Sequence, residues 1–173
     1  MSTASASSSA PPRDAGNAEL IRWAFGVLNT HDVTPLRDVW TPGTIEHFPN
    51  GTCIGTEEIA AYFEEAFAAV PDFHMEVQSI VESGEEVMIR WRLTGTHSGA
   101  AWQGIAPTGK PFTLDGIDHF VVRDGKIVSN FVVFDQMQFA RAVGLLPVDG
   151  SAADRAVKAG FGALIRLRQR LNR

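Results

Sequence analysis

The stretch FTLDGIDHFVVRDGKIVSNFVVFD, residues 112–135, decides the fold of this chain. β-Branched and aromatic residues dominate it, and the central Asp124-Gly125 pair is typical of a tight turn between antiparallel strands. We therefore predict strands over residues 112–123 and 126–135. If the turn includes a one-residue bulge, one face of this hairpin carries Asp118, Phe120, Asn130, Val132 and Phe134, whereas an unbulged turn would shift that set by one residue.

Outward from this hairpin, alternating residues predict two further strands, over 73–82 and 86–96. Earlier in the chain, helical spacing predicts helices over 17–30, 34–40 and 56–69, the last with Thr56 as its N-cap, and a brief strand over 44–48 that ends in the turn 49–51. Asp135 and Gln138 have capping-box spacing, which predicts a short helix to residue 142, stopped by Gly144. This order predicts an α+β fold with helices packed on one face of a strongly curved antiparallel sheet.

Composition limits the class of protein. A chain of 173 residues, 45% of them hydrophobic, has room for one core domain, and its net charge of −5 gives no indication of nucleic-acid binding. Cys53 is the only cysteine, so an internal disulfide and cysteine-rich metal sites are excluded. A reducing, cytoplasmic location fits this usage. No apolar run approaches the roughly 18 residues that a membrane span requires.

The two ends of the chain differ from the middle. Residues 1–15 are rich in Ser, Ala, Thr and Pro and predict a disordered leader, followed by a domain over 16–147. Residues 148–173 predict a basic amphipathic helix, in which an apolar stripe runs through Val157, Phe161, Leu164, Leu167 and Leu171. We expect that stripe to pack on the domain or on a partner chain.

Several motifs together resemble the SnoaL-like polyketide cyclases and ester cyclases of the nuclear-transport-factor-2-like superfamily. They are Gly95-Thr96-His97, Pro107-Thr108-Gly109, Asp124-Gly125-Lys126-Ile127 and Gly144-Leu145-Leu146-Pro147, together with Glu46-His47 and the Gly55 turn. The similarity covers roughly residues 17–147. It implies a cone-shaped fold with a deep pocket at the wide end, a homodimer, and chemistry without a cofactor or metal.

The resemblance also suggests catalytic residues. Residues 117–120 are similar to the strand that carries the protonated oxyanion-hole acid of ketosteroid isomerases, and residues 45–51 to the region that carries their base. This implies Asp118 as the acid and His47 as the base. Val132 stands where the cyclases carry a catalytic aspartate, and Ala24 falls near the position of the isomerases' oxyanion-hole tyrosine.

Other polar residues have structural interpretations. We expect His97 to stabilise a strand end, His119 to face away from Asp118, and Asp135 to cap a helix. In a cone fold some of the large residues must line the pocket, and we expect ligand contacts from Trp40, Phe48, Trp91, Trp102, Phe120, Asn130, Val132 and Phe134.

Three function classes remain open. The first is a cyclase or isomerase that abstracts a proton next to a carbonyl of a polyketide-, steroid- or terpenoid-like substrate. The second is a binding protein for an apolar small molecule that performs no turnover. The third is an epoxide-hydrolase-like or hydroxylase-like member of the superfamily. The sequence shows no metal cluster, phosphate-binding glycine loop or nucleophile elbow.

Overall fold

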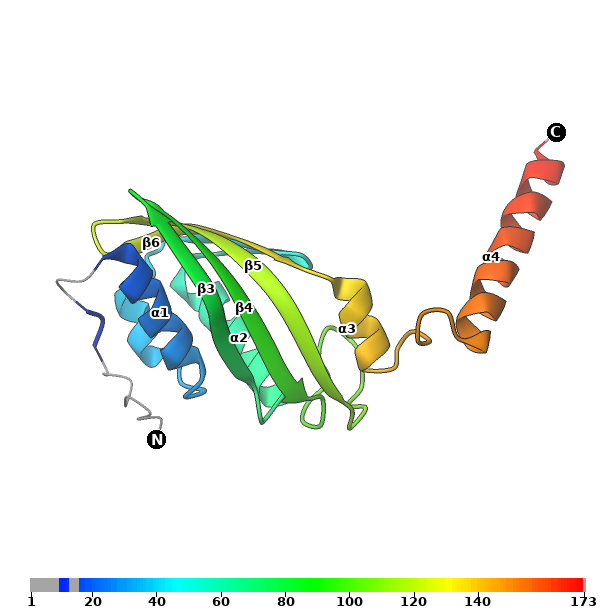
Figure 1. Ribbon diagram of the computed structural model, residues 1–173, viewed down its shortest axis with the longest axis horizontal. Coiled ribbons are helices and arrows are strands. Elements are labelled where there is room, and N and C mark those ends of the chain that lie inside the picture. The colour runs from blue at the N-terminus through cyan, green and yellow to red at the C-terminus, as the bar shows by residue number, and fades with distance from the viewer. Residues whose placement is uncertain (1–9, 13–15, 173) are drawn as a thin grey trace.

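A curved six-stranded sheet with helices against its inner face makes up the body of the molecule (Figure 1). The computed structural model describes residues 10–12 and 16–172. In chain order its elements are α1 Asn17–Leu28, the 3₁₀-helix η1 Thr34–Asp38, β1 Ile45–Phe48, β2 Gly51–Ile54, α2 Gly55–Ala69, β3 His74–Ser83, β4 Glu86–Thr96, β5 Pro111–Arg123, β6 Lys126–Phe134, α3 Gln136–Ala142 and α4 Ala152–Leu171.

The strand order is β2-β1-β6-β5-β4-β3, and the sheet does not close into a barrel. The α+β cone predicted from the sequence is confirmed. One feature differs from the prediction of an antiparallel sheet, because β1 pairs with β6 in parallel. Such a pair requires a long connection, and here the whole segment from β2 to β5 provides it.

The β5–β6 hairpin contains the one-residue bulge that the sequence left open. Val121 pairs with Ser129 but Val122 pairs with Ile127, so Val128 has no opposite residue. Beyond the bulge Asp118 lies opposite Val132 and Phe120 opposite Asn130. The bulge therefore places these four side chains on one face of the sheet, as the bulged alternative predicts.

The segment before α2 differs from the prediction. Residues 51–54 form β2 against β1, and Gly55, with φ of 80°, turns the chain into α2. The prediction that Thr56 caps this helix is wrong, since Thr56 lies inside it and the N-cap residue is Ile54. The Glu58 carboxylate instead accepts a hydrogen bond from the Ile54 N–H at 2.8 Å. At α3, by contrast, Asp135 accepts from the N–H groups of Met137 and Gln138, so the predicted cap is confirmed.

The C-terminal helix lies outside this body. Helix α4 extends away from the domain, beyond a linker that follows α3 (Figure 1). Its apolar residues are exposed, and the expected packing on the chain's own domain is not seen. Residues 1–9 and 13–15 of the predicted leader lie outside the described residues. No helix in the described part of the chain is long and apolar enough to cross a membrane.

Thr44 joins β1 to β6 through a fully buried hydroxyl. The Thr44 Oγ1 donates to the Ile127 carbonyl at 2.7 Å and accepts from the Thr41 N–H at 2.8 Å. The Thr44 carbonyl in turn accepts from the Gly55 N–H at 2.8 Å. This one residue therefore ties the start of β1 to β6 and to the start of α2.

Thr44→Val keeps the side-chain shape but leaves the Ile127 carbonyl and the Thr41 N–H without partners in the interior. We expect the free energy of unfolding, measured by urea denaturation, to fall by about 1–3 kcal/mol. Thr113→Val, at an exposed position of β5, is the matched control and should change it by less than about 0.5 kcal/mol. Equal effects of the two substitutions would contradict this role of Thr44.

Candidate functional site

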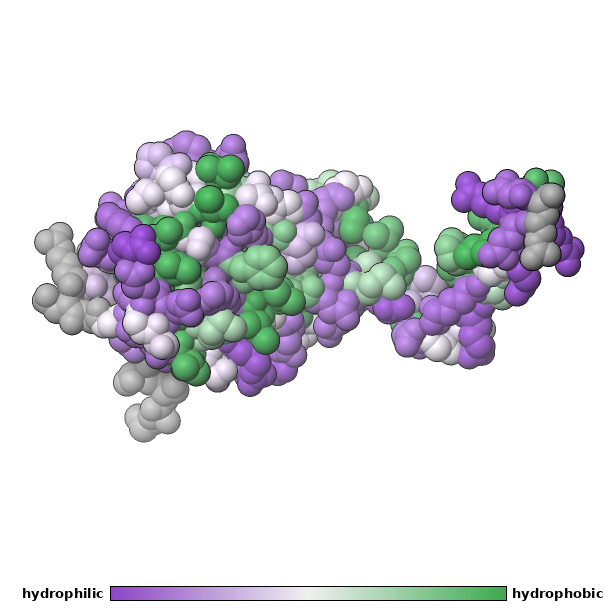
Figure 2. Space-filling model, turned by 90° about the horizontal axis from the view of Figure 1, so that it is seen from above, coloured by the Kyte–Doolittle hydropathy of each residue, from purple (hydrophilic) through white to green (hydrophobic). Residues whose placement is uncertain are grey.

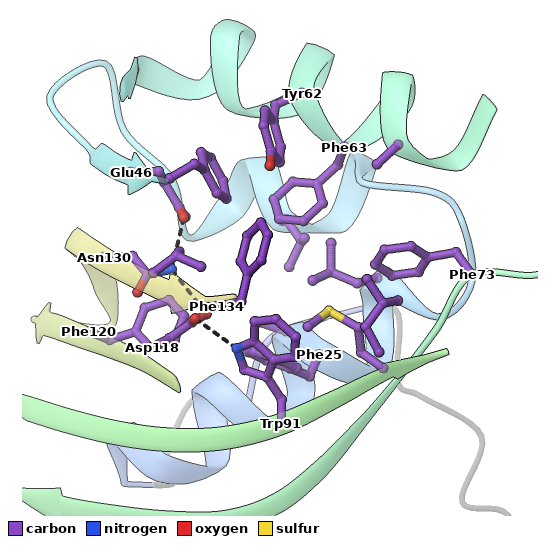
Figure 3. A pocket seen from close by; sticks show the side chains of 18 of the residues that line it. Phe25, Glu46, Tyr62, Phe63, Phe73, Trp91, Asp118, Phe120, Asn130 and Phe134 are labelled. Carbon is purple, nitrogen blue, oxygen red and sulfur yellow. Dashed lines mark hydrogen bonds between the residues drawn. The ribbon is translucent and has the colours of Figure 1, made fainter. Parts of the chain in front are cut away.

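An apolar pocket lies between the helices and the inner face of the sheet (Figure 3). About 780 Å³ of empty space lies between its walls, part of it open to solvent. Ten of its 22 lining residues are aromatic, and no Lys, Arg or His from the described residues lines it. Such walls favour an apolar ligand without negative charge.

Two carboxyl groups enter this pocket from different strands and meet at one amide. The Asn130 Nδ2 donates to Glu46 Oε2 at 2.9 Å and to Asp118 Oδ2 at 3.3 Å. The Trp91 indole N–H donates to the other oxygen of Asp118 at 2.7 Å. Figure 3 shows this chain of contacts along one wall of the cavity. The Asn130 carbonyl oxygen is buried and has no hydrogen-bond partner among the described residues.

Burial strongly affects both carboxyls. Desolvation raises the pKa of Glu46 to about 7, against lowering contributions from Asn130 and Trp40, and the negative charge of Asp118 adds to the rise. Desolvation likewise raises the pKa of Asp118 to about 7, although hydrogen bonds from Trp91 and Asn130 lower it. Two nearby carboxyls of this kind titrate as a pair, so near neutral pH the pair holds one proton.

The raised pKa values have a consequence for stability. The native state binds more protons than the unfolded chain from about pH 4 up to about pH 7. The contribution of these two groups to the free energy of unfolding is therefore greatest in acid and falls as the pH rises through their folded pKa values. Keeping two carboxyls here lowers stability at neutral pH, as is common at functional sites.

The parallel β1–β6 pair sets the position of Glu46. Glu46 lies opposite Asn130 in that pair, and alternate side chains of β1 face opposite ways. Glu46 is 3% exposed and faces the pocket, together with Phe48. His47 faces outward, where its Nδ1 lies 3.1 Å from the Thr52 hydroxyl. The structure thus places His47, the base expected from the sequence, outside the pocket, and Glu46 occupies the inward position.

The other expected positions lie in the pocket. Asp118 is buried there, and the walls include every residue for which the sequence analysis expected a ligand contact, namely Trp40, Phe48, Trp91, Trp102, Phe120, Asn130, Val132 and Phe134. Asp118 lies directly opposite Val132, so a carboxyl reaches the pocket from the strand next to the position where the resemblance implies a catalytic aspartate. Ala24 also lines the pocket.

Glu46 and Tyr62 are the titratable pocket residues that the sequence did not indicate. The alternation within β1 could have identified Glu46, because an inward Phe48 requires an inward Glu46. Tyr62 stacks on Phe48 with ring centroids 3.8 Å apart, and its hydroxyl donates to Asn50 Oδ1 at 3.4 Å. Burial is the main cause that raises the pKa of Tyr62, so this hydroxyl keeps its proton at neutral pH.

Two histidines lie outside the pocket lining. His119 faces away from Asp118, as expected, with its Nε2 3.7 Å from Glu86. His97 is fully buried at the end of β4, and its carbonyl accepts from the N–H groups of Thr108 and Gly109. The backbone of His97 thus holds the loop that follows β4. Neither ring nitrogen of His97 has a partner among the described residues.

These features agree with the family comparison. The model of the SnoaL-like polyketide cyclase family matches residues 18–143, and the chain belongs to this family. Helix α4 lies beyond the matched region. No curated protein matches the chain significantly.

Solved structures share the fold. A protein from Jannaschia sp. CCS1 that bears the name of a SnoaL-like polyketide cyclase is 21% identical, with a TM-score of 0.68, over 79% of this chain and 100% of its own. AclR from Streptomyces galilaeus, which bears the name of a hydroxylase, is 22% identical, with a TM-score of 0.65, over 84% of this chain and 91% of its own. IdmH from Streptomyces antibioticus, named as a polyketide cyclase, is 27% identical, with a TM-score of 0.60, over 72% of this chain and 95% of its own.

Gly116 makes room for the indole that bonds to Asp118. It lies opposite Trp91 in the β4–β5 pair, and a Cβ atom there would lie 2.1 Å from the Trp91 ring. The absence of a side chain at Gly116 therefore allows the Trp91 ring to lie against β5, within reach of the Asp118 carboxyl.

Gly116→Ala should displace Trp91 and break its bond to Asp118. We expect the free energy of unfolding to fall by about 1–3 kcal/mol from overpacking, and the Trp91 indole proton to shift in the NMR spectrum. Gly51→Ala in β2, where an added Cβ meets no atom within 4 Å, is the control. It should leave the free energy of unfolding and the Trp91 indole resonance unchanged. An unshifted indole resonance in Gly116→Ala would refute this role of Gly116.

Proposed function

We propose that this protein is a cofactor-free cyclase or isomerase that abstracts a proton next to a carbonyl of a polyketide-, steroid- or terpenoid-like substrate. The observation that supports it best is the pair Glu46 and Asp118, buried in an apolar pocket and joined through Asn130. A proton abstraction needs a base and a hydrogen-bond donor at the developing oxyanion, and a pair that shares one proton supplies both.

The hydrogen bonds indicate which member carries the charge. Both carboxyls accept from Asn130, and Asp118 also accepts from the Trp91 indole N–H in the shortest bond of the network, at 2.7 Å. Such bonds stabilise a carboxylate. The charge of Asp118 also raises the pKa of Glu46. We therefore assign Asp118 as the base and protonated Glu46 as the donor, which reverses the role that the resemblance implies for Asp118 and replaces His47.

The steps follow from this assignment. Asp118 takes the proton from the carbon next to the carbonyl, and the C–H electron pair moves toward the carbonyl oxygen, where the Glu46 O–H stabilises the negative charge. The enolate carbon then attacks a second carbonyl to close a ring, and protonated Asp118 gives its proton to the alkoxide that forms. For a double-bond shift, Asp118 instead returns the proton to another carbon. No oxidant or reductant is needed.

The walls support the substrate class. Stacked and edge-to-face rings such as those of Phe48, Tyr62 and Phe63 give flat faces for a planar apolar ligand. Polar groups lie together along one wall, so a carbonyl placed there leaves the rest of the ligand in apolar surroundings (Figure 3).

A second candidate function is ligand binding without turnover. The observation that favours it is Val132 at the position where the family's cyclases carry a catalytic aspartate. Under that proposal Glu46 and Asp118 hold a polar group of the ligand, and their replacement lowers affinity instead of turnover.

A deuterium-exchange assay separates the two functions and tests the roles. The probe is β-tetralone, a flat apolar ketone, in heavy water, with proton NMR following the loss of its α-proton signals. Asp118→Asn removes the base, and we expect it to slow the catalysed exchange by about 10²–10⁴-fold with little change in KM. Glu46→Gln keeps an N–H donor and should retain more activity than Asp118→Asn.

The matched control is His47→Ala, which changes the neighbouring residue on the outer face and should leave the exchange rate unchanged. Binding of β-tetralone with no catalysed exchange by the wild type would favour the binding function. Greater loss in Glu46→Gln than in Asp118→Asn would contradict the role assignment.

A further inference from the structure

Four aromatic residues of the pocket lining are only half-buried, whereas all the other lining residues are buried. The four are Phe48 at the end of β1, Tyr62 and Phe63 of α2, and Phe134 at the end of β6. A cavity opens where its lining is least buried, so these rings surround the opening, and we call them the mouth. Helix α4 lies apart from the body (Figure 2), and none of its described residues lines the pocket.

Tyr62 brings a polar group to this aromatic mouth. Its hydroxyl points from α2 toward the cavity (Figure 3), and no other side-chain hydroxyl from the described residues lines the pocket. The hydroxyl donates to Asn50 Oδ1 over 3.4 Å, and Asn50 lies in the exposed turn between β1 and β2. Hydrogen bonds between oxygens are usually about 2.7–2.8 Å long, so this one is weak and a ligand oxygen can replace it.

The Tyr62 hydroxyl lies near the carboxyl pair. The Tyr62 ring stacks on Phe48, and Phe48 lies two residues from Glu46 on the same side of β1, a separation of about 7 Å. Burial is the main cause that raises the pKa of Tyr62, and the charges of Glu46 and Asp118 are among those that add to the rise. The pocket therefore has two polar positions, the wall of Glu46, Asp118 and Asn130, and the hydroxyl at the mouth.

We propose that Tyr62 binds and activates the second carbonyl of a dicarbonyl substrate, an inference that rests on the proposed function. When a ring closes, the two carbonyl oxygens are separated only by the first carbonyl carbon, the attacking carbon and the attacked carbon. Negative charge therefore develops at two places that lie close together, and two donors that lie close together match them.

Each donor serves one oxygen. The Glu46 O–H stabilises the first oxygen as Asp118 removes the α-proton, and the Tyr62 O–H donates to the second oxygen, whose charge grows as the new C–C bond forms. The Tyr62 proton stays on the phenol, because the proton that the alkoxide receives is the one that Asp118 removed. Tyr62 thus favours ring closure over a double-bond shift, which develops no charge at a second carbonyl.

A comparison of two reactions in Tyr62→Phe tests this role. One is the exchange of β-tetralone, which has a single carbonyl. The other is the closure of 1-(2-acetylphenyl)propan-2-one, a flat diketone that loses water after its aldol step and gives a fluorescent methylnaphthol. Tyr62→Phe keeps the ring that stacks on Phe48 but removes the donor, so the ratio of closure rate to exchange rate should fall by about 10²-fold.

The matched control is Asn50→Ala, which removes the resting partner of the hydroxyl outside the pocket lining and should keep that ratio within about twofold of the wild type. An unchanged ratio in Tyr62→Phe would overturn the proposal, and so would a wild type that exchanges β-tetralone but closes the diketone no faster than buffer does. A wild type that catalyses neither reaction would contradict the proposed function and this proposal with it.

NMR detects the contact itself, because Tyr62 is the only tyrosine of the chain and tyrosine labelled with ¹³C at Cζ gives a single resonance. Asp118→Asn lacks the base and holds the diketone unreacted. Saturation of this variant with the diketone should move the Tyr62 Cζ resonance, since the hydroxyl exchanges Asn50 for a carbonyl oxygen, and β-tetralone should move it less. An unmoved resonance, or equal shifts with the two ketones, would overturn the proposal.

Discussion

Two carboxyl groups share one amide inside an apolar pocket, and the arrangement of the surrounding strands serves that contact. Glu46 reaches Asn130 because β1 pairs with β6 in parallel, and Asp118 reaches it because a bulge sets the β5–β6 register. Without the bulge, β6 would turn Asn130 to the outer face, away from both carboxyls. Thr44 holds the first pairing at its start.

The same contact brings carboxyls close to the β6 position where the resemblance implies a catalytic aspartate. Val132 stands at that position, Asp118 lies directly opposite it on β5, and Glu46 lies across the parallel pair on β1. The acid–base capacity of the pocket therefore comes from the two strands that flank β6. Trp91 and Gly116 supply a fixed donor to Asp118, so its geometry is set before a ligand enters.

The sequence predicts most of the fold and about half of the polar site. Alternation and the Asp124-Gly125 turn identify β4, β5 and β6 nearly to the residue, because these strands bury one face. Residues 51–54 are too short and too exposed for periodicity to reveal β2. The expectation of His47 rested on the suitable pKa of a histidine, but only strand alternation determines which residue faces inward, and the structure turns Glu46 to the pocket. The Asn130 bridge depends on the pairing of residues 84 positions apart, which no local pattern encodes.

Carbon-detected NMR titration of the side-chain carboxyls of Glu46 and Asp118 in the wild type tests the central claim most directly. The account predicts that both carboxyls titrate near neutral pH, well above the ordinary range of about 4, and that each responds to the ionisation of the other. Midpoints near 4 for both groups, with no coupling, would show two ordinary ionised carboxylates and would contradict the shared proton on which the proposed chemistry depends.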